Sequence, residues 1–120
     1  MNMAVDESIL ASVSEGASGP TLRLYSWAPS AISIGYFQGL QMEVDMAECR
    51  KMGVDVVRRI TGGGAVYHDA IGELTYSVVV RMDSGILPLD MLGSYRAVCN
   101  GIISGLGSIT INSVTKEIVP

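Results

Sequence analysis

The residue types with the most chemical content lie in one segment, Arg58–Asp69, which reads Arg-Arg-Ile-Thr-Gly-Gly-Gly-Ala-Val-Tyr-His-Asp. Three consecutive glycines are costly to order, because glycine loses more backbone freedom on folding than any other residue. Such a run is tolerated where the backbone bends sharply or where a ligand approaches it closely. Exposed N–H groups beside two arginines suit an anion. The segment therefore predicts a binding loop for a phosphate-bearing molecule.

A tight turn between two strands is the structural alternative for the three glycines. A two-residue hairpin loop needs only one or two glycines, so we favour the binding loop. The segment is not a nucleotide-binding P-loop, because the Gly-Lys-Ser/Thr ending of that motif is absent. The spacing Gly-x-Gly-x-x-Gly of dinucleotide-binding folds is absent as well.

The charged residues around the glycines divide into candidates for binding and for support. Arg58 and Arg59 are consecutive on a predicted strand and point to opposite faces, so one faces the ligand and the other forms an ion pair or anchors the loop. His68 is the only histidine, and a structural role and a ligand-site role are evenly balanced for it. Asp69 could orient the His68 ring or cap the turn before Gly72.

Other chemistry-bearing residues give weaker signals. Trp27 is predicted to be a core residue, whereas Tyr36 and Phe37 beside Gln38 leave open an apolar tunnel for a chain-like substrate. Cys49 and Cys99 are predicted to be reduced core thiols rather than catalytic ones, and they are too few for a disulfide framework. Ser77 lacks a nucleophile elbow. So few ligand types lie close together in the sequence that a metal site is not predicted.

Hydrophobic periodicity and breaker residues predict alternating helices and strands. The pattern predicts a hairpin between the first two strands, a close ligand approach or bulge at Gly35, and a helix end at Gly53. The fold class is α+β, with a mixed or mainly antiparallel sheet and packed helices. The predicted elements are a helix over 2–14, strands Thr21–Trp27 and Ala31–Phe37, a helix Glu43–Met52, strands Val54–Ile60 and Glu73–Arg81, a helix Leu87–Leu106 and a strand Ser108–Val114.

Length and composition limit the classes of protein. The 120 residues form one domain at most, and 48% apolar with 17% charged residues indicate a folded chain. A net charge of −4 argues against a nucleic-acid partner. No apolar run is long enough for a transmembrane helix, and the acidic start does not resemble a signal peptide. We therefore expect a cytoplasmic protein with no membrane partner.

The segment Arg58–Asp69, followed by Gly72 and Ser77, resembles the signature of lipoate–protein ligases of the A type. Glu73 departs from the asparagine usual there. The resemblance implies a biotin/lipoate ligase catalytic domain, related to the cores of class II tRNA synthetases. It extends over nearly the whole chain, to the opening helix at 2–7 and to Leu22–Tyr25, Trp27, Ser33, Gly35 and Gln38.

In activity, the resemblance implies that lipoate and ATP, with Mg as the counter-ion of ATP, give lipoyl-adenylate. The acyl group then passes to a lysine of a lipoyl carrier domain, in a 2-oxoacid dehydrogenase complex or in the H protein of glycine cleavage. It implies a contact of Arg59 with the nucleotide phosphate and a place for His68 at the acyl end of the pocket. The implied substrate- and ATP-binding residues are Arg59, Gly63, Gly64, Ala65, Val66, Tyr67, His68, Gly35 and Gln38.

The essential lysine segment of that family has no counterpart in this sequence, and Lys116 lacks its context. We therefore expect residues 1–120 to form a partial, apparently truncated catalytic domain with weak or no ligation of its own. It would be a fragment, a truncated frame, or one half of a split enzyme completed by another chain. Two alternatives remain. One is an octanoyltransferase relative, which forms an acyl-cysteine without ATP, although neither Cys49 nor Cys99 lies where that nucleophile is expected. The other is a non-catalytic module that binds lipoyl-adenylate.

Overall fold

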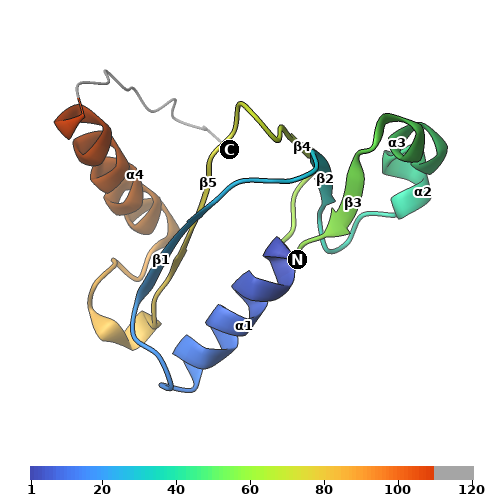
Figure 1. Ribbon diagram of the computed structural model, residues 1–120. Helices are drawn as coiled ribbons and strands as arrows, with labels where there is room; N and C mark the ends of the chain where they lie inside the picture. Colours follow the sequence, from blue (N-terminus) through green and yellow to red (C-terminus); the bar gives the residue numbers. More distant parts are fainter. Residues whose placement is uncertain (110–120) are drawn as a thin grey trace. The chain divides into compact units, whose positions relative to one another are not determined.

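The computed structural model describes residues 1–109, which form two compact units, Met1–Val79 and a second that begins at Val80. The first unit carries all the predicted site residues. Its elements are α1 (Asn2–Ser14), β1 (Thr21–Tyr25), β2 (Ala31–Ile34), α2 (Leu40–Glu43), α3 (Met46–Met52), β3 (Asp55–Arg58), β4 (Val66–His68) and β5 (Thr75–Val79) (Figure 1). The second unit contains the short 3-10 helix η1 (Met82–Ser84) and the helix α4 (Met91–Ser108).

The strands of the first unit form two small sheets. β1 pairs with β5 in antiparallel orientation, with Leu22 opposite Val78. β2 lies between β3, which is parallel to it, and β4, which is antiparallel. The α+β class with mixed and antiparallel sheets is thus confirmed. The predicted hairpin between the first two strands is wrong, because the chain passes from one sheet to the other at Ala28–Ser30, where Pro29 has no N–H for a strand ladder.

The bounds of two predicted helices differ from the sequence prediction for local reasons. The predicted helix Glu43–Met52 is two helices, because Val44 is extended and the Asp45 carboxylate caps α3 by accepting from the amides of Ala47 and Glu48. Gly53 ends α3 with a φ of 66°, as predicted.

The last helix begins at Met91 rather than Leu87, because Asp90 caps it by accepting from the amide of Gly93. It ends at Ser108, so the predicted strand Ser108–Val114 is wrong at its first residue. Its residues 110–114 lie outside the described part of the chain. None of the helices in the described part combines the length and apolar character needed to cross a bilayer.

The core of the first unit lies where β2 meets α2 and α3. Ile34, Val44 and Cys49 are buried together, and half-buried apolar side chains from the neighbouring elements pack against them. Trp27 is 5% exposed, which confirms its predicted place in the core. This cluster fixes the end of β2, and that end adjoins both Gly35 and the loop between β3 and β4.

Candidate functional site

The glycine run lies in an exposed loop, Arg59–Ala65, that joins β3 to β4. Gly63 has a φ of 97°, a conformation that residues with a side chain rarely adopt. Within the described residues, the amide N–H groups of Gly62, Gly63 and Gly64 donate to no protein acceptor. The loop therefore presents exposed hydrogen-bond donors, as an anion or a polarised carbonyl would require.

The Arg59 side chain holds this loop from inside. Its Nη1 donates to the carbonyl and the hydroxyl of Ser33 at 3.0 and 3.1 Å, and its Nη2 donates to the carbonyls of Gly62 and Gly64 at 2.9 and 2.7 Å. The C=O and N–H of a trans peptide point in opposite directions. The N–H groups of Gly63 and Ala65, which share peptide units with those carbonyls, therefore point away from the guanidinium.

Gly35 directly follows β2, and the backbone of the glycine loop packs against it. A Cβ at this position would collide with the carbonyl of Gly63. The Tyr36 amide donates to the carbonyl of Thr61 at 2.9 Å, and the Arg59 amide donates to that of Ile34 at 3.0 Å. The close approach predicted at Gly35 is therefore made by the protein's own loop backbone.

Arg58 anchors the neighbouring turn. Its Nη1 donates to the carbonyls of Gly35, Tyr36 and Gln38 at 2.8–2.9 Å. The Gln38 side chain accepts from the Gly35 amide at 2.8 Å and closes the same turn. The prediction that one arginine anchors a loop is confirmed for Arg58. Contact between Arg59 and a phosphate stays a prediction, since its four terminal N–H groups all have protein acceptors.

His68 is buried at the end of β4, with both ring nitrogens hydrogen-bonded. Its Nε2 lies 2.8 Å from Ser33 Oγ, and its Nδ1 lies 2.7 Å from Glu73 Oε1. The ring stacks on Trp27 with centroids 4.2 Å apart and planes at 14°. In this arrangement His68 supports the strand that carries the loop, and its predicted place at the acyl end of a pocket stays untested.

Glu73 is the partner of His68 that the sequence analysis missed. Partial burial acts to raise the pKa of its carboxyl, but hydrogen bonds from His68 and Thr75, the His68 charge and the Asp69 amide outweigh it and lower that pKa. Asp69 instead caps the turn, its carboxylate accepting from the Ile71 amide at 2.8 Å. The sequence did contain a signal for this pair, because Glu73 follows the only histidine by five residues. The intervening turn brings the Glu73 carboxylate back to the His68 ring.

Ser33, His68 and Glu73 are connected in the same order as the catalytic triad of a hydrolase. Ser33 is only 2% exposed, and its hydroxyl already accepts from Arg59. A nucleophile must reach its substrate, so this trio is a support for the loop rather than a reaction centre.

The side chains that follow the glycines offer apolar contact surface. Val66 is 46% and Tyr67 56% exposed, and Ala65 is exposed beside them. Tyr36 and Phe37 are exposed too, and their rings meet edge to face with centroids 5.0 Å apart. The sequence-predicted residues Gly35, Gln38 and Arg59–His68 are thus brought together around one loop.

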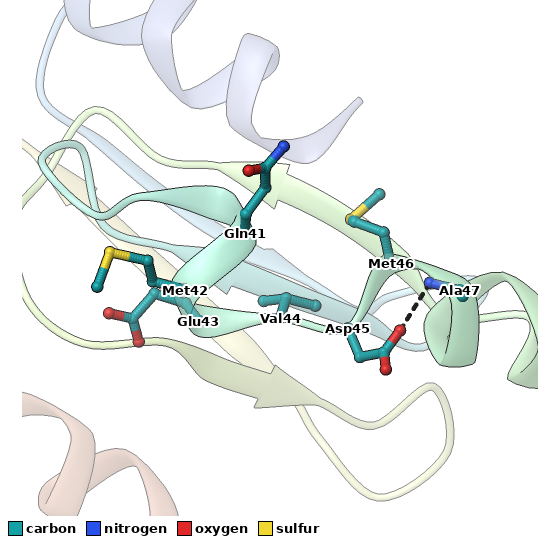
Figure 2. A pocket seen from close by; sticks show the side chains of 7 residues that line it. All are labelled: Gln41, Met42, Glu43, Val44, Asp45, Met46 and Ala47. Atoms are coloured by element: carbon teal, nitrogen blue, oxygen red, sulfur yellow. Dashed lines mark hydrogen bonds between the residues drawn. The ribbon is translucent and has the colours of Figure 1, made fainter.

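The described chain has other features that do not involve these residues. Figure 2 shows a depression of about 500 Å³ around the α2–α3 junction, lined by residues 41–47, none of which is a predicted site residue. No group of three or more possible metal ligands occurs among the described residues. Cys49 is buried in the core and Cys99 is half-buried on α4.

The family model of the lipoyl protein ligase A/B catalytic domain matches residues 1–118. The chain belongs to this family. Among its curated members, an octanoyltransferase, LipM of Clostridioides difficile, is 47% identical over 106 residues, which cover 88% of this chain and 38% of the relative.

Solved structures of this family have the same fold. A bi-partite lipoate protein ligase from Thermoplasma acidophilum, studied with its E2 lipoyl domain, matches with a TM-score of 0.76 and 32% identity over 97% of this chain and 43% of that one. A lipoate-protein ligase A bound with ATP matches with a TM-score of 0.74 and 34% identity over 98% of this chain and 47% of that one. The chain thus spans less than half the length of these relatives.

Proposed function

We propose that this chain forms the acyl-binding part of an enzyme that transfers an octanoyl or lipoyl group to a lysine of a lipoyl carrier domain. The observation that carries the proposal is the exposed Arg59–Ala65 loop, whose glycine amides have no acceptor in the described protein. Such donors stabilise the negative charge that develops on an acyl oxygen during transfer. The exposed side chains of Ala65, Val66 and Tyr67 would contact the acyl chain, with Gly63 and Gly64 supplying N–H groups.

Octanoyl transfer from a thioester, without ATP, is the form of this reaction that we favour. A thioester carbonyl is neutral and requires N–H donors, whereas adenylate formation also requires cations against the phosphates. The terminal N–H groups of Arg59 are already bound to Ser33, Gly62 and Gly64. The 47% identity to an octanoyltransferase LipM supports the same choice.

ATP-dependent lipoate ligation is the second candidate. The ATP-bound lipoate-protein ligase A of similar fold supports it, and so do the outward amides, which suit a phosphate as well as a carbonyl oxygen. The acceptor in either case would be a lipoyl domain of a 2-oxoacid dehydrogenase complex or the glycine-cleavage H protein, in the cytoplasm. The bi-partite lipoate protein ligase supports the proposal that a second chain would complete this one.

A titration followed by NMR separates the candidates. The ¹⁵N-labelled chain is mixed with octanoyl-pantetheine alone, and separately with lipoate and Mg-ATP, while an apo lipoyl domain is monitored by mass spectrometry. We expect the amide signals of Gly62–Gly64 to shift with the thioester in the absence of ATP. Shifts that require ATP would support ligation instead. If neither mixture moves these signals, the loop does not bind acyl donors and the proposal is wrong.

Arg59→Lys is the matching variant, because lysine keeps the charge but cannot bind the carbonyls of Gly62 and Gly64 and the Ser33 oxygens at once. We expect it to weaken the response to the thioester by about tenfold or more, as for the loss of charge-assisted hydrogen bonds. Arg50→Lys, on the exposed surface of α3, is the control and should bind as the unchanged chain does.

A further inference from the structure

A line of hydrogen bonds with one direction runs from Arg59 to Glu73. A guanidinium only donates, so Ser33 Oγ accepts from Arg59 at 3.1 Å and its own proton remains to be donated. The acceptor is His68 Nε2, 2.8 Å away. The other ring nitrogen of His68, Nδ1, then donates to Glu73 Oε1 at 2.7 Å.

This order fixes the proton on His68. With Nε2 as the acceptor, the neutral ring carries its proton on Nδ1. A proton on Nε2 would instead leave the Ser33 hydroxyl without an acceptor among the described residues, at a position only 2% exposed. A buried donor without an acceptor is destabilising. Every donor in the line therefore has an acceptor only when Glu73 accepts from Nδ1 of the His68 ring.

Glu73 also connects the line of hydrogen bonds to Thr75 and Trp27. Its Oε1 accepts from the Thr75 hydroxyl at 2.8 Å, and the Thr75 hydroxyl oxygen accepts from the Trp27 indole at 2.9 Å. Trp27 in turn stacks on the His68 ring. One carboxylate thus fixes both the hydrogen bonds and the stacking face of His68.

We propose that Glu73 is a positioning residue for the glycine loop, which acts through His68 and Ser33 on the Arg59 guanidinium. Ser33 receives Arg59 with both its carbonyl and its hydroxyl, which sets the plane of the guanidinium. The other edge of that plane holds the carbonyls of Gly62 and Gly64 and turns the amides of Gly63 and Ala65 outward. A carboxylate after β4 thereby determines which groups the loop offers to its ligand. The ligand is the only part of this inference that rests on the proposed function.

The test begins without a ligand. His68 is the only histidine, so the ring ¹⁵N signals of the ¹⁵N-labelled full chain report a single group. We expect a protonated Nδ1 and an unprotonated Nε2 at neutral pH. Glu73→Leu removes both acceptor atoms, and we expect a mixture of His68 tautomers and shifted amides at Gly62–Gly64. Glu73→Gln keeps an oxygen for Nδ1–H and should restore both signatures, whereas Glu7→Leu, on the exposed face of α1, should change neither.

Two results would overturn the inference. One is an Nε2–H ring in the unchanged chain, a measurement that needs no variant and holds even if Glu73→Leu fails to fold. The other is a folded Glu73→Leu chain whose Gly62–Gly64 amides match those of the unchanged chain, because Glu73 would then support only the fold.

The affinity of the chain for octanoyl-pantetheine tests the effect of Glu73 on ligand binding. We expect it to fall about tenfold in Glu73→Leu and to recover in Glu73→Gln, as for one misdirected hydrogen-bond donor. An unchanged affinity in Glu73→Leu would contradict the positioning role. Absence of binding by the unchanged chain would contradict the proposed function alone, because the tautomer and the loop amides are measured without a ligand.

Discussion

At Arg59, one guanidinium contacts oxygens from two separate segments, Ser33 at the centre of the three-stranded sheet and the glycines of the loop. The planar fork of arginine makes this possible, since its donors lie in one plane at fixed angles. The charged side chain of Arg59 therefore fixes the conformation of the loop backbone. The groups left for a ligand are the amides of the loop rather than the cation itself.

Gly35 is the residue at which a single methyl group should disturb this arrangement. In Gly35→Ala, the new Cβ would collide with the carbonyl of Gly63, and both partners are backbone. We expect a loss of about 1–3 kcal/mol in the free energy of unfolding, as for other overpacked sites. Urea denaturation measures it.

Gly19→Ala provides the matched control, because a Cβ there meets nothing within 4 Å. This variant should unfold within about 0.5 kcal/mol of the unchanged chain, as is usual for surface substitutions. Equal stability of the Gly35 and Gly19 variants would contradict the close approach of the loop to β2.

Among the elements, one carboxylate of α1 bonds to both strands of the β1–β5 pair, against which the helix packs (Figure 1). Asp6 accepts from Arg23 at 2.7 Å and from the hydroxyls of Ser77 and Tyr25 at 2.9 and 2.8 Å. Burial, with the Asp6 hydrogen bond and charge, raises the pKa of the Tyr25 phenol to about 12, although the Arg23 charge opposes this. The polar faces of both strands thus lie toward the helix, while Leu22 and Leu24 on the opposite face are 65% and 61% exposed.

Asp6→Asn should therefore loosen the helix from the strand pair. The amide cannot accept from three donors, and it removes the negative charge opposite Arg23, whose side chain is only 18% exposed. We expect a loss of about 2 kcal/mol, as for hydrogen bonds to a charged group that is partly buried. Denaturation by urea, followed by circular dichroism, gives the value. Glu7→Gln, at the exposed neighbouring position, should leave stability unchanged, and an equal effect of both substitutions would argue against the Asp6 cluster.

For the molecule as a whole, the lowered pKa of Glu73 predicts how global stability responds to acid. A carboxyl whose pKa is lower in the folded than in the unfolded state contributes stability that is complete above its unfolded pKa. That contribution is lost as the pH falls through the folded pKa. With an ordinary value of 4.5 for glutamate, the loss begins near that pH and continues below it.

The measurement compares the free energy of unfolding of the unchanged chain and Glu73→Gln over a series of pH values. The groups around Glu73 that also carry or bind charge, His68 and Asp69, are present in both proteins. We expect the difference to shrink as the pH falls below 4.5. A difference that does not depend on pH would show that the Glu73 charge does not contribute to folding.

The sequence by itself determined what depends on neighbours along the chain. The helix over residues 2–14, the end of α3 at Gly53, the exposed glycine loop and the anchoring role of one arginine follow from local periodicity, backbone freedom and residue chemistry. The family was also evident from the order of residues within Arg58–Asp69.

Only the tertiary structure decided which segments meet. It paired β1 with β5 rather than β2, and it brought Ser33 and Glu73 to one histidine and Arg59 to Ser33. It also directed Arg59 toward the loop, where its terminal N–H groups donate to two loop carbonyls and to two oxygens of Ser33. The physical reason is that strand pairing and buried hydrogen bonds are selected by groups distant in sequence, whereas periodicity and turn chemistry report only on adjacent ones.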